Sequence, residues 1–119
     1  MNKTKFAVSN YQGITVSCSD DTWEGHIVPG HSIMRDNVDA VKDTIKRPDT
    51  VYSSNQPGKR EVYFKASDIS TYDALTKVVV EYSPGKKNPD AVVGNVVTAF
   101  PTKAEKGGIA NVIFPKPKN

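Results

Sequence analysis

The chain has 119 residues, of which 37% are hydrophobic and 24% are charged, and its formal net charge is +3. This length predicts one domain over residues 1–119, and the lack of any long apolar run argues against a membrane helix or a signal peptide. A single cysteine, Cys18, excludes an internal disulfide and a cysteine-based zinc cluster, while the modest positive charge permits a polyanionic partner without requiring one.

The first half of the chain contains one alternating segment and two helical segments. Alternating apolar residues over 6–19 predict a strand or hairpin. Asp20-Asp21-Thr22 supply capping side chains, so a short helix is expected from about Trp23 to Val28, where Pro29-Gly30 would end it. Apolar spacings of three and four over 36–47 predict a second, longer helix.

The second half of the chain is rich in β-branched residues separated by turn-forming segments. Four strands are expected from this pattern, at 50–53, 60–66, 75–82 and 91–100, and one more apolar run follows at 109–114. Helices followed by strands imply an α+β fold, with two N-terminal helices packed on one face of a roughly four-stranded antiparallel sheet. The other face is free for a ligand, and the side chains expected there are some of Tyr63, Lys65, Lys77, Glu81 and Thr98.

Both histidines of the chain, His26 and His31, lie within one six-residue window. Imidazole side chains titrate near neutral pH, so two of them together supply a proton acceptor and a proton donor under physiological conditions. Pro29-Gly30 lies between them, and the expected helix break would let the second ring turn toward the first. The alternative is structural, with one histidine capping a helix or solvated and the other packed against Trp23.

Several short motifs follow one another along the chain: Trp23, His26-Ile27, His31, Val41, Thr44-Ile45, Pro48-Asp49, Tyr63, Lys77-Val78-Val79-Val80 and Val96-Val97-Thr98-Ala99-Phe100. Their order and spacing resemble the phage-associated nucleases of the barnase, EndoU, colicin and RelE-like fold, over about residues 20–108. The resemblance implies a helix pair on a four-stranded antiparallel sheet. For many members of that family it also implies a metal-independent ribonuclease that acts as a toxin.

Metal-free RNA cleavage needs a base for the 2′-hydroxyl proton, an acid for the departing 5′-oxygen, and donors or cations around the phosphorus. The candidate catalytic residues are His26 and His31 as acid and base, Thr98 as a hydrogen-bond donor to a phosphoryl oxygen, and Lys65 as a cation. The candidate substrate-binding residues are Arg60, Tyr63, Lys77 and Lys103. Each has an ordinary alternative, the cations as solvated residues and Tyr63 in a cross-strand pair. No cofactor is expected, and the scattered acidic residues argue against a metal site.

The expected activity is RNA endonuclease cleavage that leaves a 2′,3′-cyclic phosphate, with tRNA as one candidate substrate. Such a toxin would act in the cytoplasm, arrive as part of a larger phage or secreted protein, and need an inhibitor protein with an acidic contact surface. No membrane association is expected. The alternative is a non-catalytic module that binds RNA or docks to a protein on the same fold. Ser32 motivates this alternative, because members of the family commonly have a charged or prolyl residue after the second histidine.

Overall fold

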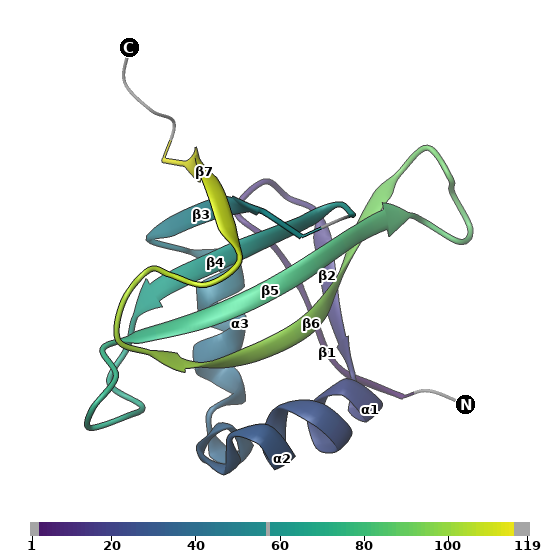
Figure 1. Cartoon of the computed structure of the whole chain (residues 1–119). Coiled ribbons are helices and arrows are strands. Elements are labelled where there is room, and N and C mark those ends of the chain that lie inside the picture. The colour runs from purple at the N-terminus through teal and green to yellow at the C-terminus, as the bar shows by residue number, and fades with distance from the viewer. Residues whose placement is uncertain (1–2, 57, 116–119) are drawn as a thin grey trace.

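The computed structural model describes residues 3–56 and 58–115 (Figure 1). The four strands expected from alternation are confirmed as β3 to β6, the expected hairpin is confirmed as β1 and β2, and the longer helix is confirmed as α3. The elements in chain order are β1 (Thr4–Ser9), β2 (Thr15–Ser19), α1 (Asp20–Thr22), η1 (Trp23–Ile27), α2 (Val28–Gly30), η2 (Ser32–Asp36), α3 (Val38–Lys46), β3 (Thr50–Ser54), β4 (Arg60–Ala66), β5 (Leu75–Pro84), β6 (Val92–Thr102) and β7 (Ile109–Phe114).

The strands form one seven-stranded mixed sheet in the order β1-β2-β6-β5-β4-β3-β7. The expected fold class, two helices on a four-stranded antiparallel sheet, is therefore wrong. The strands β3, β4, β5 and β6 do pair with one another in antiparallel order. Beyond them, β2 pairs with the free edge of β6 in parallel, and β7 pairs with the free edge of β3. Alternation within a strand identifies the strand but not its neighbour, so the two additions at the edges were not visible in the sequence.

The first helical segment continues through the proline that was expected to end it. It begins at α1, where the Thr22 amide donates to the Ser19 side chain at 3.0 Å, and it continues through η1 and α2 to Gly30. The η1 turn is π-helical, with the Val28 amide bonded to the Trp23 carbonyl. Pro29 thus lies beside an existing interruption of the α-helical ladder, where its missing N–H costs less than in a regular helix. Within the described residues, no helix combines the length and apolarity needed to cross a membrane.

The hydrophobic core lies between the helices and the curled sheet. α3 lies behind β4 and β5, and the curl brings the β1–β2 hairpin against the same helix (Figure 1). The inward face expected for α3 is confirmed, because Val41 and Ile45 are fully buried. Trp23 is also fully buried, with the Phe6 ring edge-on to it at 6.3 Å. Cys18 lies in this core, where burial raises the pKa of its thiol to about 12, so it is a packing residue.

Strand β4 is buried on both of its faces, which changes the facing expected for two candidate residues. The successive side chains of residues 62–64 are each at most 2% exposed. Tyr63 belongs to the core on the α3 side, and Lys65 points the same way, with its Nζ 3.9 Å from Asp43 on α3. The expectation that Tyr63 and Lys65 lie on the ligand-facing side is therefore wrong. Alternating polarity shows which face of a strand is buried only when the other face is exposed. In β4 both faces are buried, so the sequence pattern does not tell them apart.

A buried hydrogen-bond network ties the β1–β2 turn to the sheet. The Asn10 Nδ2 donates to the hydroxyls of Tyr63 at 3.0 Å and Tyr82 at 3.2 Å, while its Oδ1 accepts from two backbone amides of its own turn. The two hydroxyls also bond to each other, and Tyr82 donates to Glu61 Oε1 at 2.8 Å. Burial raises the pKa of Tyr63 and of Tyr82 above the ordinary value of 10.0, because a phenolate there would lose its hydration.

The network predicts that stability falls above pH 10. Unfolded tyrosine ionises near its ordinary pKa of 10.0 while the folded residues stay protonated, so the folded state binds more protons and the free energy of unfolding decreases as pH rises. At pH 11 each protected hydroxyl accounts for about 1.4 kcal/mol of this loss. Between pH 8 and pH 11, Tyr82→Phe should therefore lose about that much less stability than the wild type.

Urea unfolding at the two pH values measures this difference. Tyr72→Phe is the matched control, because the Tyr72 ring is 83% exposed, and it should lose as much stability as the wild type. Equal losses in the wild type and in Tyr82→Phe would contradict the prediction.

Candidate functional site

His31 lies where the first helical segment ends, with its ring stacked on a residue of the sheet. The backbone is held on both sides, since the His31 amide donates to the Ile27 carbonyl at 3.0 Å and the His31 carbonyl accepts from Met34 at 2.9 Å. The imidazole is stacked on the Phe100 ring of β6, with centroids 5.0 Å apart and an interplanar angle of 19°. His31 is exposed, so its ring is both positioned and accessible to a substrate.

Phe100 lines a cleft of about 260 Å³ on the face of β4, β5 and β6 that points away from α3. Three polar candidates from the sequence, Arg60, Lys77 and Thr98, line the same cleft. The strand register explains why they meet, because Lys77 pairs with Phe100 and Thr98 pairs with Val79, two residues further along β5. Residues two apart on a strand share a face. The cleft therefore brings together two cations and one hydroxyl, and His31 lies beside it through its stacking on Phe100 without lining it.

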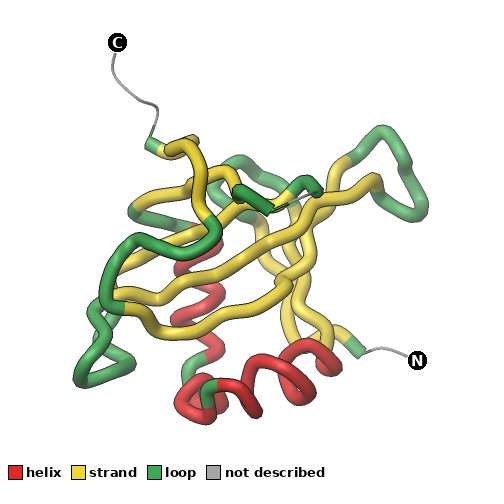
Figure 2. The backbone as a smooth tube through the Cα atoms, viewed as in Figure 1, coloured by secondary structure: helices red, strands yellow, loops and turns green. Residues whose placement is uncertain are grey.

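The connection between β6 and β7, residues 103–108, crosses the cleft side of the sheet, and we refer to it as the strap (Figure 2). The Lys77 Nζ donates to the strap carbonyls of Lys106 at 3.0 Å and Gly107 at 2.8 Å. On the other side of the strap, Glu105 accepts hydrogen bonds from Thr50 and from the Tyr52 hydroxyl at 2.6 Å, which fixes the strap to β3. The strap therefore holds a defined position at the edge of the cleft.

Lys77 is the most buried cation of the cleft, with 8% of its surface exposed. Its Nζ lies 5.2 Å from the centroid of the Phe100 ring and 5.9 Å from that of Phe64, within the range of cation–π attraction. Burial lowers the pKa of Lys77 from its ordinary value of 10.5. An ammonium group has three donors and the strap takes two, so one N–H is left for a ligand.

Arg60 and Thr98 have different local partners. The Arg60 Nε lies 2.9 Å from Glu81 Oε2 in a partly exposed ion pair, so its charge is already balanced in the free protein. The Thr98 hydroxyl makes no hydrogen bond with any residue in the described part of the chain, and its side chain is half-buried. Of the two, Thr98 is the more available donor for a substrate oxygen.

The other sequence candidates lie outside this cleft. Tyr63 is fully buried in the core, so it cannot stack on a base in this conformation. Lys65 donates to the Arg47 carbonyl at 2.8 Å on the α3 side, and Lys103 is an exposed residue of the strap. His26 is exposed on η1, and its side chain makes no hydrogen bond or ring contact with another residue within 3–56 and 58–115. Because the helix does not break at Pro29, the expected approach of the two histidines through a break does not occur.

Sequence reasoning missed the residue on which the cleft depends. Phe100 ends the motif Val96-Val97-Thr98-Ala99-Phe100, but the motif by itself predicts no role for the Phe100 ring. The available signal was its position two residues after Thr98 on the same strand, which gives both side chains the same face. An aromatic residue on the ligand-facing side of a sheet is a candidate for stacking, and here the partner is the imidazole of His31.

The chain was compared with protein-family models, with curated proteins and with solved structures, and none of them matches. The resemblance to the barnase-type nucleases therefore stays a prediction from the order of the motifs, and the four-stranded sheet that it implied is not the sheet found.

Proposed function

We propose that this domain is a metal-independent RNA endonuclease whose active site is the cleft around His31, Lys77 and Thr98. The observation that carries the proposal is the stacking of His31 on Phe100, at a face that also presents Lys77 and Thr98. The imidazole is accessible for proton transfer, and the Phe100 ring on which it stacks also lies near the Lys77 ammonium, which with the Thr98 hydroxyl could stabilise a phosphorane.

In the proposed reaction the 2′-oxygen of a ribose attacks the adjacent phosphorus. The bond between the 2′-oxygen and phosphorus forms and the bond to the 5′-oxygen breaks, so the products are a 2′,3′-cyclic phosphate and a free 5′-hydroxyl. One histidine accepts the 2′-hydroxyl proton and the other donates a proton to the departing 5′-oxygen. His31 is the histidine beside the cleft. His26, on η1 of the same helical segment, is the other histidine, and because no contact places it at the cleft, its part in the reaction is tested separately with His26→Ala.

The remaining cleft residues would bind the non-bridging phosphoryl oxygens. The free N–H of Lys77 and the hydroxyl of Thr98 are preorganised donors, and a fixed donor in a partly dehydrated site stabilises developing negative charge better than water does. Arg60 would bind a flanking phosphate in exchange for Glu81.

Incubation of RNA with the purified protein in EDTA tests this function. We expect cleavage to persist in EDTA and the new 3′ ends to carry cyclic phosphates. Cleavage that requires a divalent metal would contradict the mechanism. RNA binding without any cleavage, unchanged in His26→Ala and His31→Ala, would instead favour the non-catalytic binding module.

The toxin interpretation adds a partner. A ribonuclease active in the cytoplasm would damage the RNA of the cell that makes it, so we propose an inhibitor protein that covers the cleft. The strap presents the exposed cations Lys103 and Lys106 beside the cleft, so the contact surface of the inhibitor would be acidic. Delivery within a larger phage or secreted protein belongs to the same proposal.

A further inference from the structure

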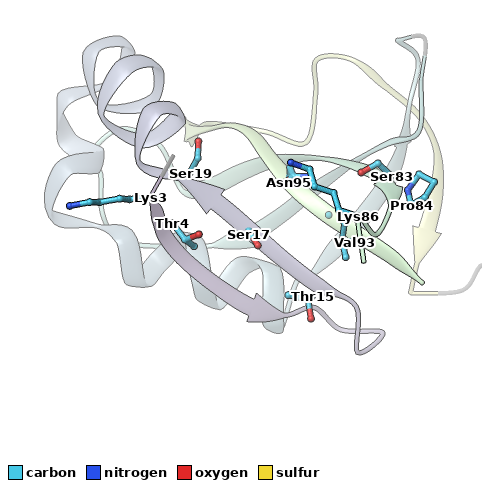
Figure 3. Close-up of a pocket in the computed structure, with 11 residues that line it drawn as sticks. Lys3, Thr4, Thr15, Ser17, Ser19, Ser83, Pro84, Lys86, Val93 and Asn95 are labelled. Carbon is cyan, nitrogen blue, oxygen red and sulfur yellow. The ribbon is translucent and has the colours of Figure 1, made fainter. Parts of the chain in front are cut away.

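A second hollow, of about 530 Å³, lies where the β1–β2 hairpin meets the ends of β5 and β6 (Figure 3). We refer to it as the polar groove. Thr15 and Ser17 line it from β2, while Ser83, Lys86 and Asn95 line it from the β5–β6 side. Lys3 also lines the groove, but its side chain points away from the hollow (Figure 3). None of its eleven lining residues is an aspartate or glutamate, so the groove is neutral to basic.

The groove exists because β2 and β6 pair over a very short length. Their parallel register contains only Val16 with Gly94 and Ser17 with Asn95. Gly94 makes this approach possible, since a Cβ at that position would lie 2.9 Å from side-chain atoms of both Val16 and Val80. Beyond these pairs the strands diverge and leave polar side chains facing open space.

Among the polar side chains that line the groove, Ser19 is used as the N-cap of α1, whereas most of the others have no partner in the described part of the chain. Thr15, Ser17, Ser83 and Asn95 make no side-chain hydrogen bond, and Lys86 makes no ion pair, with any residue that the structure describes. By contrast, Lys5, Lys42, Lys65 and Arg60 each lie within 4.0 Å of a carboxylate. Free hydroxyls, an amide and an ammonium, without a carboxylate, match a phosphodiester chain, which offers negatively charged acceptors and sugar oxygens.

The groove and the cleft lie along one strand face. Asn95 pairs with Glu81 and Thr98 pairs with Val79, and because Glu81 and Val79 are two residues apart they share a face. The register shift between Val79 and Val80 adds one residue to β6, so Asn95 and Thr98 face the same way despite their odd spacing. From Asn95 to Phe100 the strand spans about 16 Å, a distance that a short single strand of RNA can cover.

We propose that the polar groove is a second RNA-binding site, which holds the backbone of a single-stranded substrate on one side of the scissile phosphate. This site rests on the proposed nuclease function and adds a preference for substrates long enough to span the groove and the cleft. Lys86 binds a phosphate, and Ser17 and Asn95 bind the phosphate or ribose next to it.

The test uses an uncleavable probe, a 2′-O-methyl RNA single strand of about 12 nucleotides, with the otherwise unmodified protein. Lys86→Gln should weaken binding about fivefold and reduce the slope of log K against log salt by about 0.7, the value for one lost phosphate contact on a single strand. Lys87→Gln removes the same charge from the neighbouring residue, which does not line the groove, and should bind as the wild type does. Ser17→Ala with Asn95→Ala should weaken binding without changing the salt slope.

With cleavable RNA, Lys86→Gln should raise KM for the long substrate and leave kcat unchanged, and neither should change for a dinucleotide. If Lys86→Gln and Lys87→Gln bind the probe equally while the wild type cleaves RNA, the groove proposal is overturned and the nuclease stands. Probe binding that depends on Lys86 in a protein that cleaves no RNA would keep the groove and overturn the nuclease. A wild-type protein that does not bind the probe would overturn the groove proposal directly.

Discussion

His31→Ala is expected to lower kcat for RNA cleavage by a factor on the order of 10²–10⁴, the usual contribution of a positioned acid or base. The imidazole is exposed, and among the described residues its ring contact is with Phe100, so its removal should change the free energy of unfolding by no more than about 0.5 kcal/mol. The measurement is kcat on a defined RNA, with urea unfolding of the same preparation. A large loss of activity at unchanged stability identifies a chemical role.

Two further variants separate chemistry from position. Free imidazole should partly restore cleavage by His31→Ala, because it replaces the lost proton carrier without replacing the side chain. Phe100→Leu should keep most of the buried apolar surface but lose the stacking that orients His31, so its loss should be smaller and imidazole should not correct it. If His31→Ala cleaves RNA as fast as the wild type, the cleft is not the active site.

The sequence predicted the strands and the main helix well, because their signals are local. Residues 75–82 and 91–100 are rich in β-branched side chains, and the spacing of Val41 and Ile45 matches one buried helix face. The order of strands was not predictable in the same way. The parallel pairing of β2 with β6 joins Ser17 to Asn95 across most of the chain, and no local pattern encodes such a contact.

The candidate site was predicted in part, and the misses have physical causes. His31, Lys77, Thr98 and Arg60 were singled out from the sequence, and all four are at the cleft or beside it. Tyr63 and Lys65 were placed on the wrong face, because β4 carries large apolar side chains on both faces. The position of the strap was not predicted. Lys77 binds it through backbone carbonyls, which every residue has, so the side chains of residues 103–108 do not indicate this contact.

Lys77→Met is expected to lower kcat by about 10²–10³, the effect of removing one preorganised donor from a developing negative charge. Methionine keeps most of the buried stem but has neither charge nor N–H. It also leaves the carbonyls of Lys106 and Gly107 without their donor, so a displaced strap contributes to any loss of stability. Unfolding in urea and kcat, measured on one preparation, separate these two contributions.

Gly107→Ala is the matched variant, because it disturbs the strap and keeps the charge. Gly107 has a φ of +88°, and a Cβ there would lie 2.7 Å from the Lys77 Nζ, so alanine must push the ammonium away from its position. If the position of the ammonium matters, Gly107→Ala should lose kcat without losing positive charge. If only the charge matters, it should cleave as the wild type does.

The pH dependence of kcat decides whether the Lys77 ammonium is the group that acts. Burial lowers the pKa of Lys77 from 10.5, so its charge, and the stabilisation it gives to the phosphorane, is present below the lowered pKa and is lost as pH rises through it. The wild type should therefore lose kcat at a pH below that expected for an exposed lysine, and Lys77→Met, already slow, should lack this alkaline decline. If the Lys77→Met protein cleaves at the wild-type rate, Lys77 has no part in the chemistry and serves only to hold the strap in position.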